Sequence, residues 1–393
     1  MQTSSSIRND PWILRFSSIK LTLGLIIASM ALIFAGTLAQ VRMGITPAVE
    51  AYFRSWWLDV PLPGGGLSLP LIPAGRSIGL LLFLNLTAAW IVYFRPTFRQ
   101  SGIWLSHAAI MILLVGEFFT GFYQEEWVMP LDEGGSSSYV QAYAAQELAL
   151  VHTDPETGNL RTLAVDMPLP GRKSEIPFEN IPFKIEVTEW VPHAELEQDS
   201  SVSSRLPRGI GFKKATPPTA PDRVAEPLVL LKVSLPGKDT REILLHSRLE
   251  PLPLPGYPDW TLSLRFARNP LSFRFTLKDF VHEKYEGTEI PKHFASKLML
   301  TDLPDGPPRQ VEISMNEPFR YQGWTFYQQS FANEGETSIL HAVRNPVRLL
   351  PYVACVVGAF GLLLHVCLHR GSQFKSERPG TPSDKPKLPS KRW

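Results

Sequence analysis

The chain has 393 residues, 44% of them hydrophobic, and a formal net charge of +2 at pH 7. So small a positive excess argues against a nucleic-acid partner, which would require a strongly basic face. The two cysteines, Cys355 and Cys367, both lie near the C-terminus, and there is no CxxC pair. A disulfide framework, a thiol-exchange site and an Fe–S site are therefore excluded from the long central region. No dinucleotide-binding, nucleotide-binding, zinc-protease or serine-hydrolase motif is present.

Four apolar stretches occur in the chain, at residues 21–40, 77–94, 102–122 and 349–368. Each is long enough to cross the hydrocarbon core of a membrane as a helix, and Glu117 is the only acidic residue among them. The first has the basic start of a signal peptide, but its apolar run is longer than a signal core, so we expect an uncleaved anchor. The sequence thus predicts a membrane protein with four transmembrane α-helices.

Lysine and arginine residues predict the orientation, because they favour the cytoplasmic side when they flank a span. They are frequent in residues 1–20, in the link 95–101 and in the Pro-rich tail 369–393. We expect these three segments inside the cell and residues 41–76 and 123–348 outside it. The basic tail is predicted to be disordered and to lie near anionic lipid.

Residues 123–348, between the third and fourth spans, are numerous enough to fold by themselves. Seven runs in this segment alternate apolar and polar residues between Pro, Gly and Asp turns, which predicts strands. They are residues 183–190, 227–235, 260–266, 273–280, 297–303, 309–315 and 323–331. We expect a large, mainly antiparallel β domain, built as a sandwich or an open barrel. A mobile loop or internal boundary is predicted at 195–227, and a turn at 316–319 is predicted to join two paired strands.

His107 lies inside the third apolar stretch, about one and a half helical turns from its start. An ionisable side chain at such depth is costly unless it has a function or a partner. From the span alone, a histidine tolerated through a hydrogen bond to a neighbouring helix is an equally good explanation.

Two more histidines, His365 and His369, lie one helical turn apart near the end of the last apolar stretch, where they could bind a metal ion from one helix face. Interaction with the last carbonyl groups of the helix is the reading that we favour. The histidines of the predicted β domain show no close metal-ligand spacing, and we expect them at the surface or hydrogen-bonded. They are His152, His193, His246, His282, His293 and His341.

Three segments of the sequence resemble the ResB/CcsB family of cytochrome c biogenesis proteins. The first is FSSIKLTLGLIIASMALIFAGTLAQV, in the first span and its lead-in. The other two lie one after the other in the predicted β domain and are FTLKDFVHEKYEGTEIPKHFASKLMLTD and ISMNEPFRYQGWTFYQQSF. The order of three spans, one large outer domain and a fourth span is also similar to that of the family. Several separate motifs in the right order make this resemblance specific, although residues 194–227 and the basic tail lie outside it.

The resemblance implies a multi-pass protein of the bacterial cytoplasmic membrane that works in the System II machinery. Such proteins carry haem b across the bilayer and present it for covalent attachment to apocytochrome c. The family works with a second membrane protein, ResC or CcsA, whose tryptophan-rich WGxWxWD-type loop is absent from this sequence. This chain therefore resembles the ResB/CcsB half, a subunit that is not expected to act as an enzyme alone.

Family members carry a histidine early in the third span and use it as a transmembrane haem ligand, which implies that His107 is an axial ligand. Neutral imidazole suits haem iron, and coordination would offset the cost of burying it. His365 and His369 are secondary candidates. The alternative function is a membrane-anchored β domain that binds or scaffolds an envelope component without haem, which would explain the strands but leave His107 without a role.

Overall fold

The structure is a computed structural model that divides into two compact units. The helical unit comprises residues 1–123 and 346–393, and the sheet unit comprises residues 124–345. The residues that the structure describes are 8–61, 68–94, 97–169, 175–197, 211–215, 226–236, 240–287, 291–332 and 336–376.

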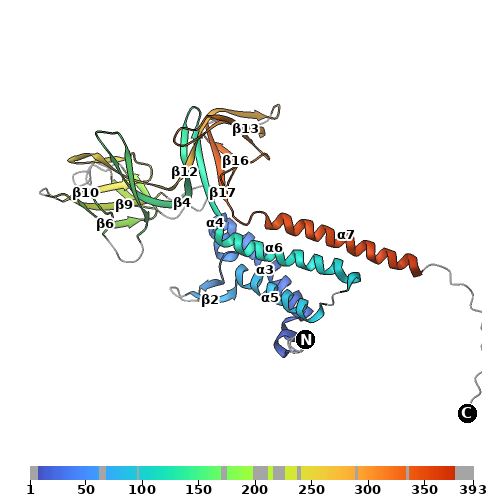
Figure 1. The fold of residues 1–393 in the computed structure, drawn as a ribbon. Coiled ribbons are helices and arrows are strands. Elements are labelled where there is room, and N and C mark those ends of the chain that lie inside the picture. Colours follow the sequence, from blue (N-terminus) through green and yellow to red (C-terminus); the bar gives the residue numbers. More distant parts are fainter. Residues whose placement is uncertain are drawn as a thin grey trace, which may run out of the picture. The chain divides into compact units, whose positions relative to one another are not determined.

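The helical unit contains four helices, among the described residues, that are long and apolar enough to cross a membrane (Figure 1). The last of them continues as a helix past its apolar part, which ends at Leu368. A two-stranded hairpin precedes the second long helix. The elements are α2 (Pro11–Phe16), α3 (Ile19–Met43), α4 (Ile45–Tyr52), β1 (Trp57–Pro61), β2 (Ser68–Pro73), α5 (Gly75–Tyr93), η1 (Phe98–Gln100), α6 (Ser101–Tyr123) and α7 (Leu350–Ser376).

A buried amide fixes α5 against the start of α3. Asn85 is only 1% exposed, and Thr22 donates a hydrogen bond of 2.7 Å to its Oδ1. Its Nδ2 donates to the carbonyl oxygens of Phe16 and Ser18. Because polar groups between apolar helices must find partners there, this set of bonds determines how the two helices align.

The sheet unit is built around one ten-stranded antiparallel sheet, with a three-stranded sheet and a two-stranded hairpin beside it. The large sheet has the main order β14-β13-β12-β4-β3-β17-β16-β15, and the small sheet has the order β10-β9-β6. The predicted large antiparallel sheet domain is therefore confirmed. Its strands are β3 (Glu125–Asp132), β4 (Ser136–Thr153), β5 (Leu160–Met167), β6 (Lys184–Val191), β7 (Ala194–Glu197), β8 (Gly211–Lys214), β9 (Leu228–Ser234), β10 (Arg241–His246), β11 (Leu252–Leu254), β12 (Tyr257–Lys284), β13 (Pro291–Asp302), β14 (Arg309–Ser314), β15 (Phe319–Tyr321), β16 (Trp324–Ala332) and β17 (Thr337–Arg344).

The two largest hydrophobic cores among the described residues of the sheet unit both receive side chains from the long strands β4 and β12. The first lobe is a sandwich of two sheets. The small sheet packs face to face with β4, β5, β11 and the first half of β12. In the second lobe, β3, β13, β14, β16, β17 and the second half of β12 surround a core in which Phe273, Phe275 and Leu277 alternate along β12. The alternation of inward and outward residues thus gives each half of β12 a buried face.

The turn prediction at residues 316–319 is only partly correct. The segment does reverse between β14 and β15, but β14 pairs with β13, whereas β16 pairs with β15 and β17. The two predicted strands of β12, 260–266 and 273–280, are one continuous strand, because the intervening residues pair with β4 through a register shift. Residues 194–197 and 211–214 form the β7–β8 hairpin, and most of the remainder of the predicted loop 195–227 lies outside the described residues.

His246 is the most deeply buried histidine that the structure describes, at 1% exposure. Its Nδ1 lies 3.1 Å from the backbone N–H of Arg248, which donates to it, and its Nε2 lies 3.4 Å from the carbonyl oxygen of Ala194. Burial is the main cause that lowers the pKa of His246, and the positive charge of Arg248 lowers it further. The hydrogen bond to Ala194 and the negative charge of Glu226 raise this pKa, but by less. The neutral ring, with its proton on Nε2, is therefore the form that fits the fold.

We predict that the sheet unit loses stability as the pH falls below about 6.5, the ordinary histidine value. The unfolded chain then takes up a proton that the folded His246 resists, so its contribution is complete above that pH and is lost below it. The measurement is thermal unfolding of the full chain, followed by the β-sheet signal in circular dichroism at several pH values. His246→Asn should make this dependence shallower and cost about 1–2 kcal/mol at neutral pH. The control His293→Asn, which leaves His246 in place, should keep the pH dependence of the wild type. If His246→Asn shows the same pH dependence as the wild type, His246 is not its source.

Candidate functional site

His107 lies in the second turn of α6, with its side chain partly exposed. Its Nδ1 is 2.8 Å from the carbonyl oxygen of Ile103, one turn earlier. Because a carbonyl oxygen only accepts hydrogen bonds, Nδ1 must be the donor. This bond fixes the ring orientation and leaves the lone pair on Nε2 available to a metal ion.

An aromatic cluster from α5 and α6 lies beside His107. The ring centroid of Trp104 is 6.2 Å from that of His107 and 6.4 Å from that of Trp90, with the two indoles nearly parallel. Phe94 packs edge-on against Trp104 at 4.7 Å. The Nε1 of Trp104 is buried without a hydrogen-bond partner among the described residues. Flat, apolar surfaces and an available imidazole nitrogen are thus brought together at one end of α6.

Helix α7 packs against α6 at very short range, because small residues line both sides. Gly102, Ala109 and Gly116 are the buried residues of α6, and their spacing of seven places them on one face. A Cβ added at Gly102 would lie 2.4 Å from the backbone nitrogen of His365, and one at Gly361 would lie 2.9 Å from the backbone nitrogen of Ser106. The two backbones therefore touch, as in small-residue packing between membrane helices.

The structure places the secondary candidates on α7. His365 lies opposite Gly102, with its Nδ1 buried, whereas Cys367 is exposed. His369 is within the helix, but its side chain lies outside the described residues. Of the two arginines in the basic link before α6, Arg99 is exposed in η1 and Arg95 lies outside the described residues. Among the described residues, no cluster of three or more His, Cys, Asp or Glu side chains could hold a metal ion.

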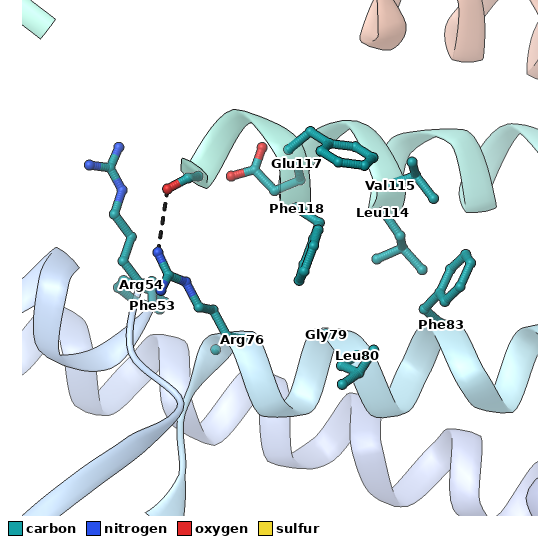
Figure 2. A pocket seen from close by; sticks show the side chains of 13 residues that line it. Phe53, Arg54, Arg76, Gly79, Leu80, Phe83, Leu114, Val115, Glu117 and Phe118 are labelled. Carbon is teal, nitrogen blue, oxygen red and sulfur yellow. Dashed lines mark hydrogen bonds between the residues drawn. The ribbon is translucent and has the colours of Figure 1, made fainter. Parts of the chain in front are cut away.

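A pocket of about 340 Å³ lies at the opposite end of α6, between α5 and α6 and beside the end of α4 (Figure 2). Sequence reasoning missed it, because its charged residues come from separate segments that the sequence does not connect. Its lining residues are Phe53, Arg54, Gly75, Arg76, Gly79, Leu80, Phe83, Leu114, Val115, Glu117, Phe118, Phe119 and Gly121.

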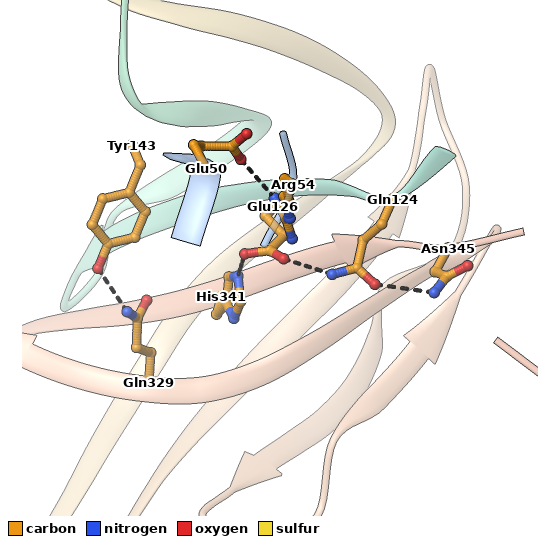
Figure 3. Close-up of polar contacts among 8 residues, drawn as sticks. All are labelled: Glu50, Arg54, Gln124, Glu126, Tyr143, Gln329, His341 and Asn345. Atoms are coloured by element: carbon orange, nitrogen blue, oxygen red, sulfur yellow. Dashed lines mark hydrogen bonds and ion pairs between the residues drawn. The ribbon is translucent and has the colours of Figure 1, made fainter. Parts of the chain in front are cut away.

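The sheet unit carries a set of polar contacts on β3, β4, β16 and β17 (Figure 3). Gln329 donates a hydrogen bond of 2.7 Å to the hydroxyl of Tyr143, and the Nε2 of His341 lies 3.7 Å from a carboxylate oxygen of Glu126. Burial lowers the pKa of His341, and Glu126 acts against this shift. These contacts link side chains of β16 and β4, and of β17 and β3.

The comparisons with known proteins match both units of the chain. The model of the ResB-like family matches residues 260–366, which extend from β12 into α7. Protein NrfI of Wolinella succinogenes is 23% identical over 299 residues, which cover 75% of this chain and 30% of NrfI. The chain thus spans less than a third of that relative. A structure of the cytochrome c haem lyase CcmF has 12% identity over 74% of this chain and 30% of its own, with a TM-score of 0.20, too low to support a common fold.

The contact between α6 and α7 can be tested by adding a side chain where none fits. Gly102→Leu should force the helices apart and cost about 1–3 kcal/mol, as overpacking does elsewhere. The measurement is the midpoint of thermal unfolding of the full chain in detergent. Gly24→Leu on α3 is the matched control, because a Cβ at Gly24 meets nothing within 4 Å. Equal midpoints for the two variants would show that the backbones do not touch.

Proposed function

We propose that the chain is a member of the ResB/CcsB family and serves cytochrome c biogenesis by holding haem within the bacterial cytoplasmic membrane; the match of the ResB-like family model and the similarity to NrfI support this. The observation that carries this proposal is the geometry of His107. The ring is oriented by its own helix, and its Nε2 is left as the available ligand atom.

The proposed membrane placement has α3, α5, α6 with η1, and α7 as the four spans. Lysine and arginine in the N-terminal segment, the link before α6 and the tail after α7 favour the cytoplasmic side. The sheet unit, residues 124–345, then lies outside the cytoplasm. His107 lies about 8 Å into the bilayer from the inner side, at 1.5 Å per residue.

The surroundings of His107 suit a porphyrin. Trp90 and Trp104 offer nearly parallel indole faces, and the buried Nε1 of Trp104 is a donor without a described partner. Apolar rings pack well against a flat macrocycle, and a ring nitrogen supplies the axial bond to the iron. In this function His107 binds and orients haem as cargo, while the aromatic cluster limits the access of water.

The chain is proposed to act with a ResC/CcsA-type membrane protein and to deliver haem to apocytochrome c. The partner would supply the opposite axial ligand and the tryptophan-rich loop that this sequence lacks. His365 and His369 on α7 remain secondary candidates for haem binding, since α7 packs directly on α6. This assignment makes the chain a subunit of a haem-handling complex and not an enzyme by itself.

The membrane placement predicts which parts of the chain a protease can reach. In intact spheroplasts, tags at either terminus should resist protease, and a cleavage site introduced between residues 194 and 227 should be cut. The measurement is the size of the fragments on an immunoblot. After lysis both tags should be cut, which shows that they are cleavable. Cleavage of a terminal tag before lysis would contradict the four-span arrangement.

The role of His107 predicts the behaviour of His107→Gly in the complex co-expressed with its partner. Bound haem, read from the Soret band, and holocytochrome c, read from haem staining, should both fall at least tenfold, because the axial ligand is lost. Added imidazole should restore part of the maturation by filling the space that the variant leaves. A membrane-anchored β domain without haem would show no Soret band in any variant.

The matched control for this prediction is Ile110→Gly, one turn further along α6, where the side chain is 49% exposed. It introduces the same loss of helix propensity, about 1 kcal/mol, without removing the imidazole. Ile110→Gly should keep the Soret band. If His107→Gly retains haem content and maturation equal to those of the control, the proposal is wrong.

A further inference from the structure

The pocket between α5 and α6 is amphipathic along its length. Figure 2 shows Arg54, Arg76 and Glu117 at one end, and Phe83 and Leu114 at the other. Arg76 belongs to the first turn of α5, and Phe83 is seven residues further on, which is about 10 Å along a helix. The charged end thus coincides with the end of an apolar helix, and the apolar part continues towards the helix centre.

The charged end carries groups of both signs. Arg76 lies 4.5 Å from the ring centroid of Phe122 and donates a hydrogen bond of 3.3 Å to the carbonyl oxygen of Gly121. Among the described residues it has no carboxylate partner. Arg54 pairs with Glu50 at 3.0 Å. Glu117, the acidic exception in the apolar stretches, is exposed at the pocket and forms no ion pair with a described residue.

Two glycines keep the pocket open. A Cβ placed on Gly79 or on Gly121 would meet no atom within 4 Å, so free space lies directly over both backbones. Gly75, by contrast, would place a Cβ only 2.4 Å from the carbonyl oxygen of Phe53, which closes the end of the pocket. The volume of about 340 Å³ is within the range of small-molecule sites.

We propose that this pocket binds one zwitterionic phospholipid with a primary ammonium headgroup, such as phosphatidylethanolamine. The phosphate lies against Arg76, with Arg54 nearby, and the ammonium group donates to the carboxylate of Glu117. The acyl chains run past Gly79 along Leu80 and Phe83. This inference rests on the membrane placement in the proposed function and not on haem binding.

The charges decide between this occupant and two others. An anionic lipid such as phosphatidylglycerol satisfies Arg76 but brings no cation to Glu117. Haem has two carboxylates, which would place a second negative charge beside Glu117, and like charges at short range repel. A headgroup with one phosphate and one ammonium group complements both Arg76 and Glu117 at the apolar boundary, where screening by water is weak.

The test uses the full chain in lipid nanodiscs made from equal amounts of phosphatidylethanolamine and phosphatidylglycerol, with retained lipid counted by native mass spectrometry. The wild type should retain one phosphatidylethanolamine, enriched about tenfold over phosphatidylglycerol. Glu117→Gln should reduce this enrichment to about one, a loss of roughly 1.4 kcal/mol in relative affinity. Gly79→Leu should abolish retention by filling the pocket, and it removes a helix-weakening glycine.

Gly24→Leu on α3 is the matched control for Gly79→Leu, since a side chain there also meets open space but lies outside the pocket. It should retain the lipid. Retention by Gly79→Leu, or equal enrichment in wild type and Glu117→Gln, would overturn the proposal. If Gly79→Leu elutes as an aggregate on size exclusion, the proposal is tested by comparing the phosphatidylethanolamine enrichment of Glu117→Gln with that of the wild type.

A haem titration of the complex co-expressed with its partner, read from the Soret band, separates the two proposals. His107→Gly should lose haem and keep the lipid, whereas Gly79→Leu should lose the lipid and keep haem. Loss of haem in Gly79→Leu with the lipid retained would assign the pocket to haem and overturn this inference. Failure of the wild type to bind haem, with the lipid retained, would contradict the proposed function alone.

Discussion

The closeness of the α6 and α7 backbones is the constraint on which the helical unit depends. Gly102 and Gly361 leave room for backbone atoms where any other residue would place a Cβ below 3 Å from its neighbour. In an apolar solvent, helices gain little by burying apolar surface, so this fit and its van der Waals contacts must hold the pair together. Because one face of α6 is committed to α7, the face that carries Trp104 and His107 is left for contacts with α5 and for a ligand.

In the sheet unit, the constraint is that its two largest hydrophobic cores share the same two long strands. Strand β12 runs through both, and its pairing with β4 shifts register between Phe266 and Arg268 and again between Pro270 and Phe275. At the first of these shifts, Glu147 accepts a bond of 2.8 Å from Arg265 and another from the backbone of Arg268. A buried carboxylate with several donors is well satisfied, so the irregular ladder is stabilised where its backbone bonds are lost.

The sequence predicted the elements that periodicity determines and missed those that long-range pairing determines. Four apolar helices and the strands β6, β9, β12, β13, β14 and β16 were predicted, because length and alternation are local properties. The long central strand β4 and its neighbours β3, β5 and β17 were not predicted. Residues 267–272 contain Pro270 and polar side chains and were expected to separate two strands, yet pairing with β4 keeps β12 continuous. His107 attracted attention because it is polar within an apolar run. The pocket at Arg76 and Glu117 could not be predicted, since only the packing of α5 on α6 brings those residues together.

The α6–α7 contact can form only late in synthesis of the chain. The first and last strands of the sheet unit, β3 and β17, pair along their length, with Glu125 opposite Arg344, so the unit's two ends are neighbours in the finished sheet. During synthesis, however, the ribosome must add the residues of this unit, 124–345, before α7 exists. At about 5–20 residues per second, α6 waits on the order of 10–45 s for its partner. Until then its glycine face is open to lipid, to other helices and to the quality-control proteases of the membrane.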